Sequence, residues 1–327
     1  MHGRLQFAEF IASLPALCGF HPVDSLVLAA FRPESGGGDR FLFLSRIDLP
    51  REDASGCVAA CLPPLQRVEG VEVVAVVWEA SPESTATEVL DLLPAVLAAH
   101  RIPLLARLLV ADGRLRFFDC SAPCCRLGSP LPRVPRVVAR QTPQPLASRA
   151  AMAASLQPGP LADSVGDAVD RVGAVSPAQA VAAWAVILRS ASVGMVETED
   201  LARAVVGLGD VATRDALIAH LLPGTVPPES FPPDLWALVG AAFAEVGSNE
   251  GWSARLTEFA ALVPSRCAAA PLTVCAAIFW GLGDGARAQI CLDRAVEADP
   301  DYRLARLLVA MVELGVDPRA AMTVGGR

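Results

Sequence analysis

The sequence contains no lysine, and all 27 of its basic residues are arginines. The acidic residues number 35, which gives a formal net charge of −8. Residues 1–150 hold 15 arginines and 15 acids, so the excess negative charge belongs to the rest of the chain. Because a chain with this balance creates no positive field that would attract nucleic acid, we expect no nucleic-acid partner.

Long apolar runs are also missing. The most apolar stretch, residues 94–111, contains His100 and two arginines and is cut by Pro103, so it does not read as a membrane span. The N-terminal segment does not read as a secretory signal, because Glu9 and Pro15 interrupt its apolar part. We therefore expect a soluble, cytoplasmic protein with no membrane partner.

The common catalytic motifs are absent. The sequence has no nucleophile elbow, P-loop, dinucleotide-binding glycine fingerprint or HExxH motif. This does not exclude an enzyme, but it leaves no motif that calls for a cofactor, and we expect none.

What is present predicts an α/β domain over residues 1–122. The apolar run Leu26–Phe31 follows the turn residues of GFHPVDS and is typical of a strand buried on both faces. A short glycine-rich turn joins it to a strand that ends near Leu49, which predicts a hairpin. The remaining pattern predicts strands at 71–78, 104–110 and 114–120, with helices at 5–17, about 52–65, and from Ser81 to about 100. The domain should therefore hold a mixed sheet of about five strands with covering helices.

The composition then changes twice. Residues 123–160 are rich in proline and arginine and predict a linker or a long ordered loop. Residues 161–327 predict an all-α helical domain, with helices near 161–173, 177–191, 197–207, 211–221, 233–246, 252–263, 268–282, 285–298 and 301–314. The pair near 268–300 has the spacing of one tetratricopeptide-like (TPR-like) hairpin, and without further copies it should end a bundle rather than found a solenoid.

The most site-like residues of the first domain lie around the predicted hairpin: His21, Asp24, Ser25, Arg46 and Asp48. Pairing of the two strands would bring the start of one beside the end of the other. A histidine near a carboxylate and a hydroxyl is suited to proton transfer or nucleophile activation. The alternative is that Asp24 and Ser25 form a turn while Arg46 pairs with Asp48 or a neighbour.

A second candidate is the proline-rich segment, which has no acid between residues 121 and 162. Its arginines, Arg133, Arg136, Arg140 and Arg149, could bind a phosphate or an acidic partner through bidentate contacts. The alternative is that they pair with the acids of the chain's own C-terminal half.

Three cysteines, Cys120, Cys124 and Cys125, form the only cysteine cluster in the sequence. They could hold zinc with His21 as fourth ligand, although structural zinc usually takes two separated pairs. A redox thiol is a second possibility, and partly or fully buried thiols are the third.

Several motifs resemble one known family. The motifs are GFHPVDSLVL, the strand end at 46–50, the PCC at 123–125, the SRA at 148–150, and the region from GDGA at 283–286 to Asp299-Pro300. In this order they are similar to the actinobacterial domain-of-unknown-function family 4192. Members commonly have a further proline after the double cysteine, where this chain has Arg126. The resemblance implies no activity and assigns no catalytic residue.

Two functional hypotheses follow. The first is a protein-interaction or small-ligand-binding module, with its site between the two domains and an unidentified protein or small anion as partner. The second is a hydrolase-like enzyme that uses His21 with Asp24 or Ser25.

Overall fold

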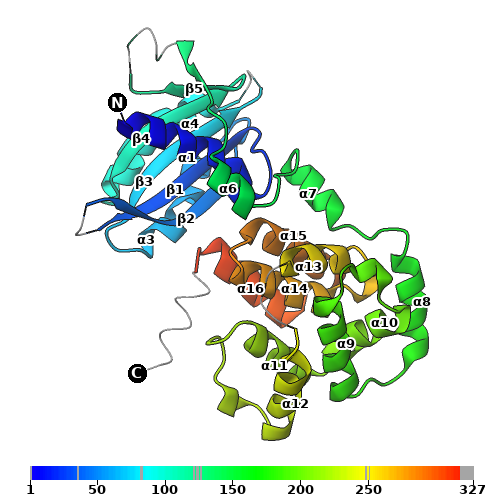
Figure 1. Ribbon diagram of the computed structural model, residues 1–327. Helices are drawn as coiled ribbons and strands as arrows, with labels where there is room; N and C mark the ends of the chain where they lie inside the picture. The colour runs from blue at the N-terminus through cyan, green and yellow to red at the C-terminus, as the bar shows by residue number, and fades with distance from the viewer. Residues whose placement is uncertain are drawn as a thin grey trace. The chain divides into compact units, whose positions relative to one another are not determined.

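The structure is a computed structural model that describes residues 2–316 except 35–36, 82–83, 121, 123–124, 126, 247–248 and 250, with side chains from Phe7 onward. It divides into two compact units, whose elements are labelled in Figure 1. Unit 1 comprises Met1–Arg149 with Glu313–Gly315, and unit 2 comprises Ala150–Val312 with Val316–Arg327.

The described part of unit 1 contains a six-stranded mixed sheet in the order β2-β1-β3-β4-β5-β6. The strands are β1 (Ser25–Pro33), β2 (Asp39–Asp48), β3 (Glu72–Glu79), β4 (Leu104–Ala111), β5 (Arg114–Phe117) and β6 (Ser129–Pro130). Only β3 and β4 pair in parallel, and the other neighbours are antiparallel. The mixed sheet predicted from the sequence is confirmed, with β6 added as a strand too short to leave a pattern.

The strand β1 lies between β2 and β3 and is buried along its first six residues. Residues 26–30 are all 0% exposed, which confirms a strand buried on both faces. It forms the predicted hairpin with β2, in a register that runs from Ser25 opposite Asp48 to Pro33 opposite Asp39. Alternate side chains of a strand point to opposite faces of the sheet. Leu26 and Leu28 therefore pack in the hydrophobic core on one face, and Val27 packs in the core on the other.

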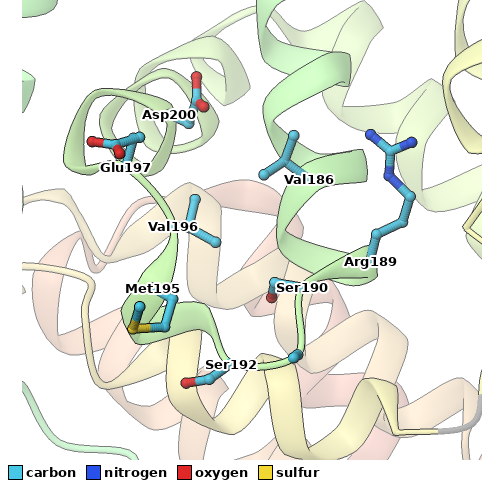
Figure 2. Close-up of a pocket in the computed structure, with 9 residues that line it drawn as sticks. Val186, Arg189, Ser190, Ser192, Met195, Val196, Glu197 and Asp200 are labelled. Carbon is cyan, nitrogen blue, oxygen red and sulfur yellow. The ribbon is translucent and has the colours of Figure 1, made fainter.

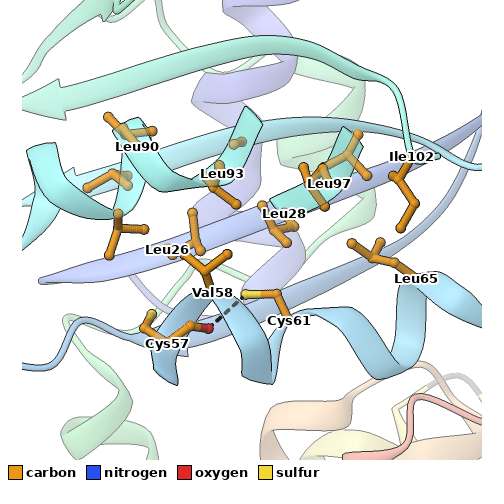
Figure 3. Close-up of a cluster of buried hydrophobic side chains, with 14 of the residues drawn as sticks. Leu26, Leu28, Cys57, Val58, Cys61, Leu65, Leu90, Leu93, Leu97 and Ile102 are labelled. Carbon is orange, nitrogen blue, oxygen red and sulfur yellow. Dashed lines mark hydrogen bonds between the residues drawn. The ribbon is translucent and has the colours of Figure 1, made fainter. Parts of the chain in front are cut away.

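Helices cover both faces of this sheet. They are α1 (His2–Cys18), α2 (Ala54–Ala60), α3 (Leu62–Gln66) and α4 (Ala86–Ala99). The last three pack on one face around Leu26 and Leu28, as Figure 3 shows. The other face packs against α1, and the short helix α6 (Arg136–Gln141) lies beside α1 (Figure 1).

Three element predictions for unit 1 were wrong in detail. The helix expected after Ser81 begins only at Ala86. Before it, the backbone N–H groups of Ala80 and Ser81 donate to the Asp24 carboxylate. The single helix expected at 52–65 is two helices, since the prolines after Leu62 supply no N–H to continue α2. The strand β5 ends at Phe117 rather than near residue 120.

Unit 2 is helical, as predicted. Its α-helices are α7 (Arg149–Ser155), α8 (Ala162–Val172), α9 (Pro177–Arg189), α10 (Thr198–Val206), α11 (Val211–Leu221), α12 (Pro233–Phe243), α13 (Trp252–Ala260), α14 (Ala269–Gly281), α15 (Gly285–Ala298) and α16 (Arg303–Glu313). Each of the nine helices expected after residue 160 has its counterpart, with ends that differ by at most three residues. In the described part of the chain, no helix combines the length and apolarity needed to cross a membrane.

The helices α14 and α15 form the expected hairpin. Gly283, at φ +84°, makes the turn in a backbone conformation that favours glycine, and the Asp284 carboxylate caps α15 at the Arg287 N–H. Gly281 lies so close to Leu222 that a Cβ on it would meet the leucine side chain at 2.1 Å. The hairpin is established, while its likeness to a tetratricopeptide repeat stays a prediction.

Candidate functional site

Asp24 fastens three strand ends of unit 1 together. Because β1 runs antiparallel to β2 and β3, its first residues lie beside the last residues of both. The Asp24 carboxylate accepts hydrogen bonds from the N–H groups of Ala80 (2.8 Å) and Ser81 (3.0 Å), and its carbonyl oxygen accepts one from Leu49 (2.8 Å). Asp24 has φ +38°, a left-handed conformation that aspartate tolerates better than most residues.

The next three predicted residues form one bonded group. The guanidinium of Arg46 donates to the hydroxyl of the fully buried Ser25 from Nη2 (2.7 Å) and Nε (3.1 Å), and it also pairs with Asp48. The Ser25 hydroxyl in turn donates to the Val23 carbonyl oxygen (2.6 Å). A hydroxyl has one proton and two lone pairs, so all the hydrogen-bonding capacity of Ser25 is used.

His21 is near this group in the chain but is not bonded into it. Its imidazole is exposed, and no hydrogen bond joins it to any residue that the structure describes. Its backbone N–H donates to the Leu146 carbonyl oxygen (2.9 Å), and the Leu146 N–H donates to Gly19 (2.9 Å). The contacts of the other four candidate residues match the alternative stated from the sequence, in which Asp24 and Ser25 form a turn while Arg46 pairs with Asp48.

Residues 131–149, which we call the arginine segment, are anchored to the rest of unit 1 at two points, and the backbone contacts at Leu146 are one of them. At the other point the Leu131 N–H donates to the Gly113 carbonyl oxygen (3.0 Å), and the Leu131 side chain packs in the core beneath α1. The helix α6 lies between these two anchors, and it was not expected in a proline-rich stretch.

The arginine segment presents three of its arginines to solvent. Arg133, Arg136 and Arg140 are exposed, and none of them forms an ion pair or side-chain hydrogen bond with a described residue of unit 1. Arg136 and Arg140 are four residues apart on α6 and share one face of that helix. Arg149 is partly buried and engaged in contacts of its own, so it does not belong to this exposed set.

The cysteine cluster lies partly outside the described residues. Cys124 is not described, and Cys120 and Cys125 are partly buried. The described residues include no group of three or more metal-binding side chains placed around one point. With Cys124 missing from that set, the zinc and redox hypotheses stay predictions.

Four cysteines outside this cluster are buried thiols: Cys57, Cys61, Cys275 and Cys291. Burial raises the pKa of Cys57 to about 11, with Asp53 and Asp48 adding to the effect, and raises that of Cys291 to about 12. The pKa values of Cys61 and Cys275 are raised by burial as well. Because the thiolate is the reactive form, these four are poor nucleophiles and poor metal ligands.

Unit 2 holds a concavity that no sequence motif marked. Its volume is about 470 Å³, and Figure 2 shows its lining from the end of α9, the 3-10 turn η1 (Val193–Met195) and the start of α10. The lining residues are Val186, Arg189, Ser190, Ala191, Ser192, Met195, Val196, Glu197 and Asp200. Serines, acids and small apolar residues at helix ends are common, so the sequence had no signal for it.

Comparison with known proteins places most of the chain in one family. A family model described as "Domain of unknown function (DUF4192)" matches residues 8–319. The chain belongs to this family. The DUF4192 match includes residues of both units, and with them Asp24, the bonded group of Ser25, Arg46 and Asp48, the arginine segment and the concavity. No curated protein and no solved structure matches the chain.

Proposed function

We propose that this DUF4192 chain is a protein-interaction module that binds an acidic partner through the exposed arginines of the arginine segment. The observation that carries the proposal is the state of Arg133, Arg136 and Arg140. All three are exposed and lack an ion pair within unit 1, in a stretch with no acid between residues 121 and 162. Guanidinium groups in this state are free to make bidentate bonds to carboxylates.

The anchoring of the segment supports a binding role. Leu131 at one end and Leu146 at the other are tied by backbone hydrogen bonds to the rest of unit 1. A cationic segment that is already fixed loses less conformational entropy on binding than a free tail would. The backbone that carries these arginines is therefore already anchored to unit 1 at both of these points.

The shape of the surface favours a protein over a small anion. Arg136 and Arg140 project from the outside of a helix, with Val137 between them 60% exposed. Small ligands usually need a concave site that removes most of their surface from water. An acidic segment of a partner protein could instead cover the valine and pair with both arginines.

A binding measurement on the full chain tests the proposal. The probe is a fluorescein-labelled octaglutamate peptide, followed by anisotropy at low and physiological salt. We expect saturable binding that weakens as the salt concentration rises. The affinity of the Arg136→Ala/Arg140→Ala variant should be lower by at least about tenfold, which is equivalent to ~1.4 kcal/mol.

The matched control removes the same charge elsewhere on unit 1. Arg51 and Arg67 are also exposed, and the Arg51→Ala/Arg67→Ala variant should bind like wild type. Equal weakening in both variants would mean a general charge effect and would overturn the proposal. Displacement of the peptide by sub-millimolar inorganic phosphate would overturn the choice of a protein partner in favour of a small anion.

A further inference from the structure

We infer that the concavity of unit 2 is a second, separate docking site, which takes a partner segment bearing an apolar side chain next to a basic one. Its most telling residue is Met195, which is 85% exposed on η1 at the edge of the concavity. With Val186 and Val196 it forms an apolar patch inside a space of about 470 Å³. Methionine is flexible and polarizable, and it adapts to differently shaped apolar partners.

The wall of the concavity is held in place from behind. Glu258 of α13 accepts hydrogen bonds from the Val193 N–H (2.6 Å) and the Ser192 hydroxyl (2.9 Å). Arg255 of the same helix donates from Nε to the Ser190 carbonyl oxygen (2.8 Å). The loop that carries Met195 is thus ordered before a partner arrives, which lowers the entropic cost of binding.

The charges around the concavity decide the chemistry of the occupant. Arg189 already pairs with Glu245 (3.1 Å), and Asp200 pairs with Arg203 (2.7 Å). Glu197 lies on the lining, is exposed, and has no ion pair or side-chain hydrogen bond to a residue that the structure describes. A basic group of the partner would complement Glu197 while a neighbouring apolar side chain enters beside Met195.

A peptide selection on the full chain tests this inference. A random-peptide display library is selected on wild-type protein, and the enriched peptides are synthesised and measured by anisotropy against the variants. We expect enriched sequences with an apolar residue within two positions of Arg or Lys, at least tenfold weaker binding to Met195→Glu, and several-fold weaker binding to Glu197→Gln. Since Met195 is exposed, its substitution should leave the fold intact.

Matched controls use residues of the same kind outside the concavity. Leu307, 55% exposed on α16, gives Leu307→Glu, and the exposed Glu229 gives Glu229→Gln. Both should bind the peptides like wild type. If no basic-apolar sequence is enriched, or if every enriched peptide binds Met195→Glu as tightly as wild type, the inference is wrong. Peptides that are acidic and depend on Arg136 and Arg140 would report on the arginine segment alone, so the two proposals fail separately.

Discussion

Single polar residues of this protein have structural roles that the residue type alone does not predict. Asp24 is the clearest case, since its carboxylate and carbonyl oxygens accept bonds from three separate backbone N–H groups. Removing the carboxylate takes away the acceptor to which the backbone N–H groups of Ala80 and Ser81 donate. At the residue scale, Asp24 and Ser25 therefore have a structural role, which is to hold the start of β1 against the ends of its neighbouring strands.

We predict that Asp24→Ala lowers the free energy of unfolding by about 1–3 kcal/mol, the net contribution of hydrogen bonds to a charged acceptor. Asparagine keeps an oxygen acceptor and tolerates a positive φ, so Asp24→Asn should stay within about 0.5 kcal/mol of wild type. Urea unfolding monitored by circular dichroism measures both. Equal stability of the alanine variant and wild type would show that the bonds to Ala80 and Ser81 contribute nothing.

His220 of α11 gives a pH-dependent prediction. Its ring lies 5.6 Å from that of Trp236 and 5.5 Å from that of Phe243, and burial lowers its pKa below the ordinary value. The unfolded chain then binds the proton more readily than the folded one. The stability that neutral His220 gives the folded protein is therefore complete above the pKa of the unfolded chain, about 6.5. It is lost as the pH falls through the lower pKa of the folded protein.

The measurement is the free energy of unfolding against pH, for wild type and for His220→Phe. The stability of wild type relative to the variant should fall as pH is lowered from about 7 to 5. If the two curves are parallel over this range, the packing of His220 does not favour its neutral form.

Between elements, close backbone approach sets the packing of unit 2. Gly207 follows α10, and a Cβ built on it would lie 2.2 Å from the Cβ of Ala180 on α9. No flexible side-chain end is available to move away from such a contact. The two helices can therefore approach this closely only with glycine at one of the two positions.

A double-mutant cycle tests that contact. Gly207→Ala should cost about 1–3 kcal/mol through overpacking, and Ala180→Gly about 1 kcal/mol through helix propensity. The double variant should be more stable than the sum of the two losses allows, because the clash is gone. Additive losses would mean that the helices shift apart freely and that close approach is not required.

Arg294 joins helix ends in the same unit. Only 7% exposed, it donates to the carbonyl oxygens of Leu156, Ala260 (2.9 Å) and Val263 (3.3 Å), which lie at or just after the ends of α7 and α13. Burial lowers its pKa, but an arginine stays charged. The positive charge there also complements the negative end of the α13 dipole.

We expect Arg294→Met to lower the unfolding free energy by about 2–4 kcal/mol, because three buried acceptors lose a charged donor. The exposed Arg303 on α16 supplies the control, and Arg303→Met should stay within about 0.5 kcal/mol of wild type. A loss of similar size in both variants would show that Arg294 acts through its charge and not through its bonds.

At the scale of the whole molecule, each unit has its own core and its own buried thiols. Cys57 and Cys61 lie in the core of unit 1 between α2 and the sheet (Figure 3), and Cys275 and Cys291 lie in the α14–α15 hairpin of unit 2. Burial and raised pKa values protect all four from alkylation.

Mass spectrometry after iodoacetamide treatment at pH 8 should find these four cysteines unmodified in the native protein and modified in guanidinium chloride. In Arg294→Met at intermediate denaturant, Cys275 and Cys291 should become modified at a lower concentration than in wild type, while Cys57 and Cys61 keep their wild-type midpoint. Simultaneous exposure of both pairs in the variant would mean that the two units unfold as one.

The sequence by itself determined the elements of this protein, because their signals are local. The periodicity of the apolar side chains and the turn residues are properties of neighbours in the chain. They predict the buried apolar segment at 26–30, the β-branched strand at 72–79 and the nine C-terminal helices. Proline misled the pattern twice, at the break between α2 and α3 and at α6.

Tertiary structure alone decided the contacts between distant residues. That Asp24 holds Ala80 and Ser81, that Arg294 holds Leu156, and that Glu258 holds the loop of Met195 depend on segments tens of residues apart. The residue types at these positions are common on any surface or turn. Their roles arise only when the folded chain places a particular donor beside a particular acceptor, which is a matter of distance in space and not of order along the chain.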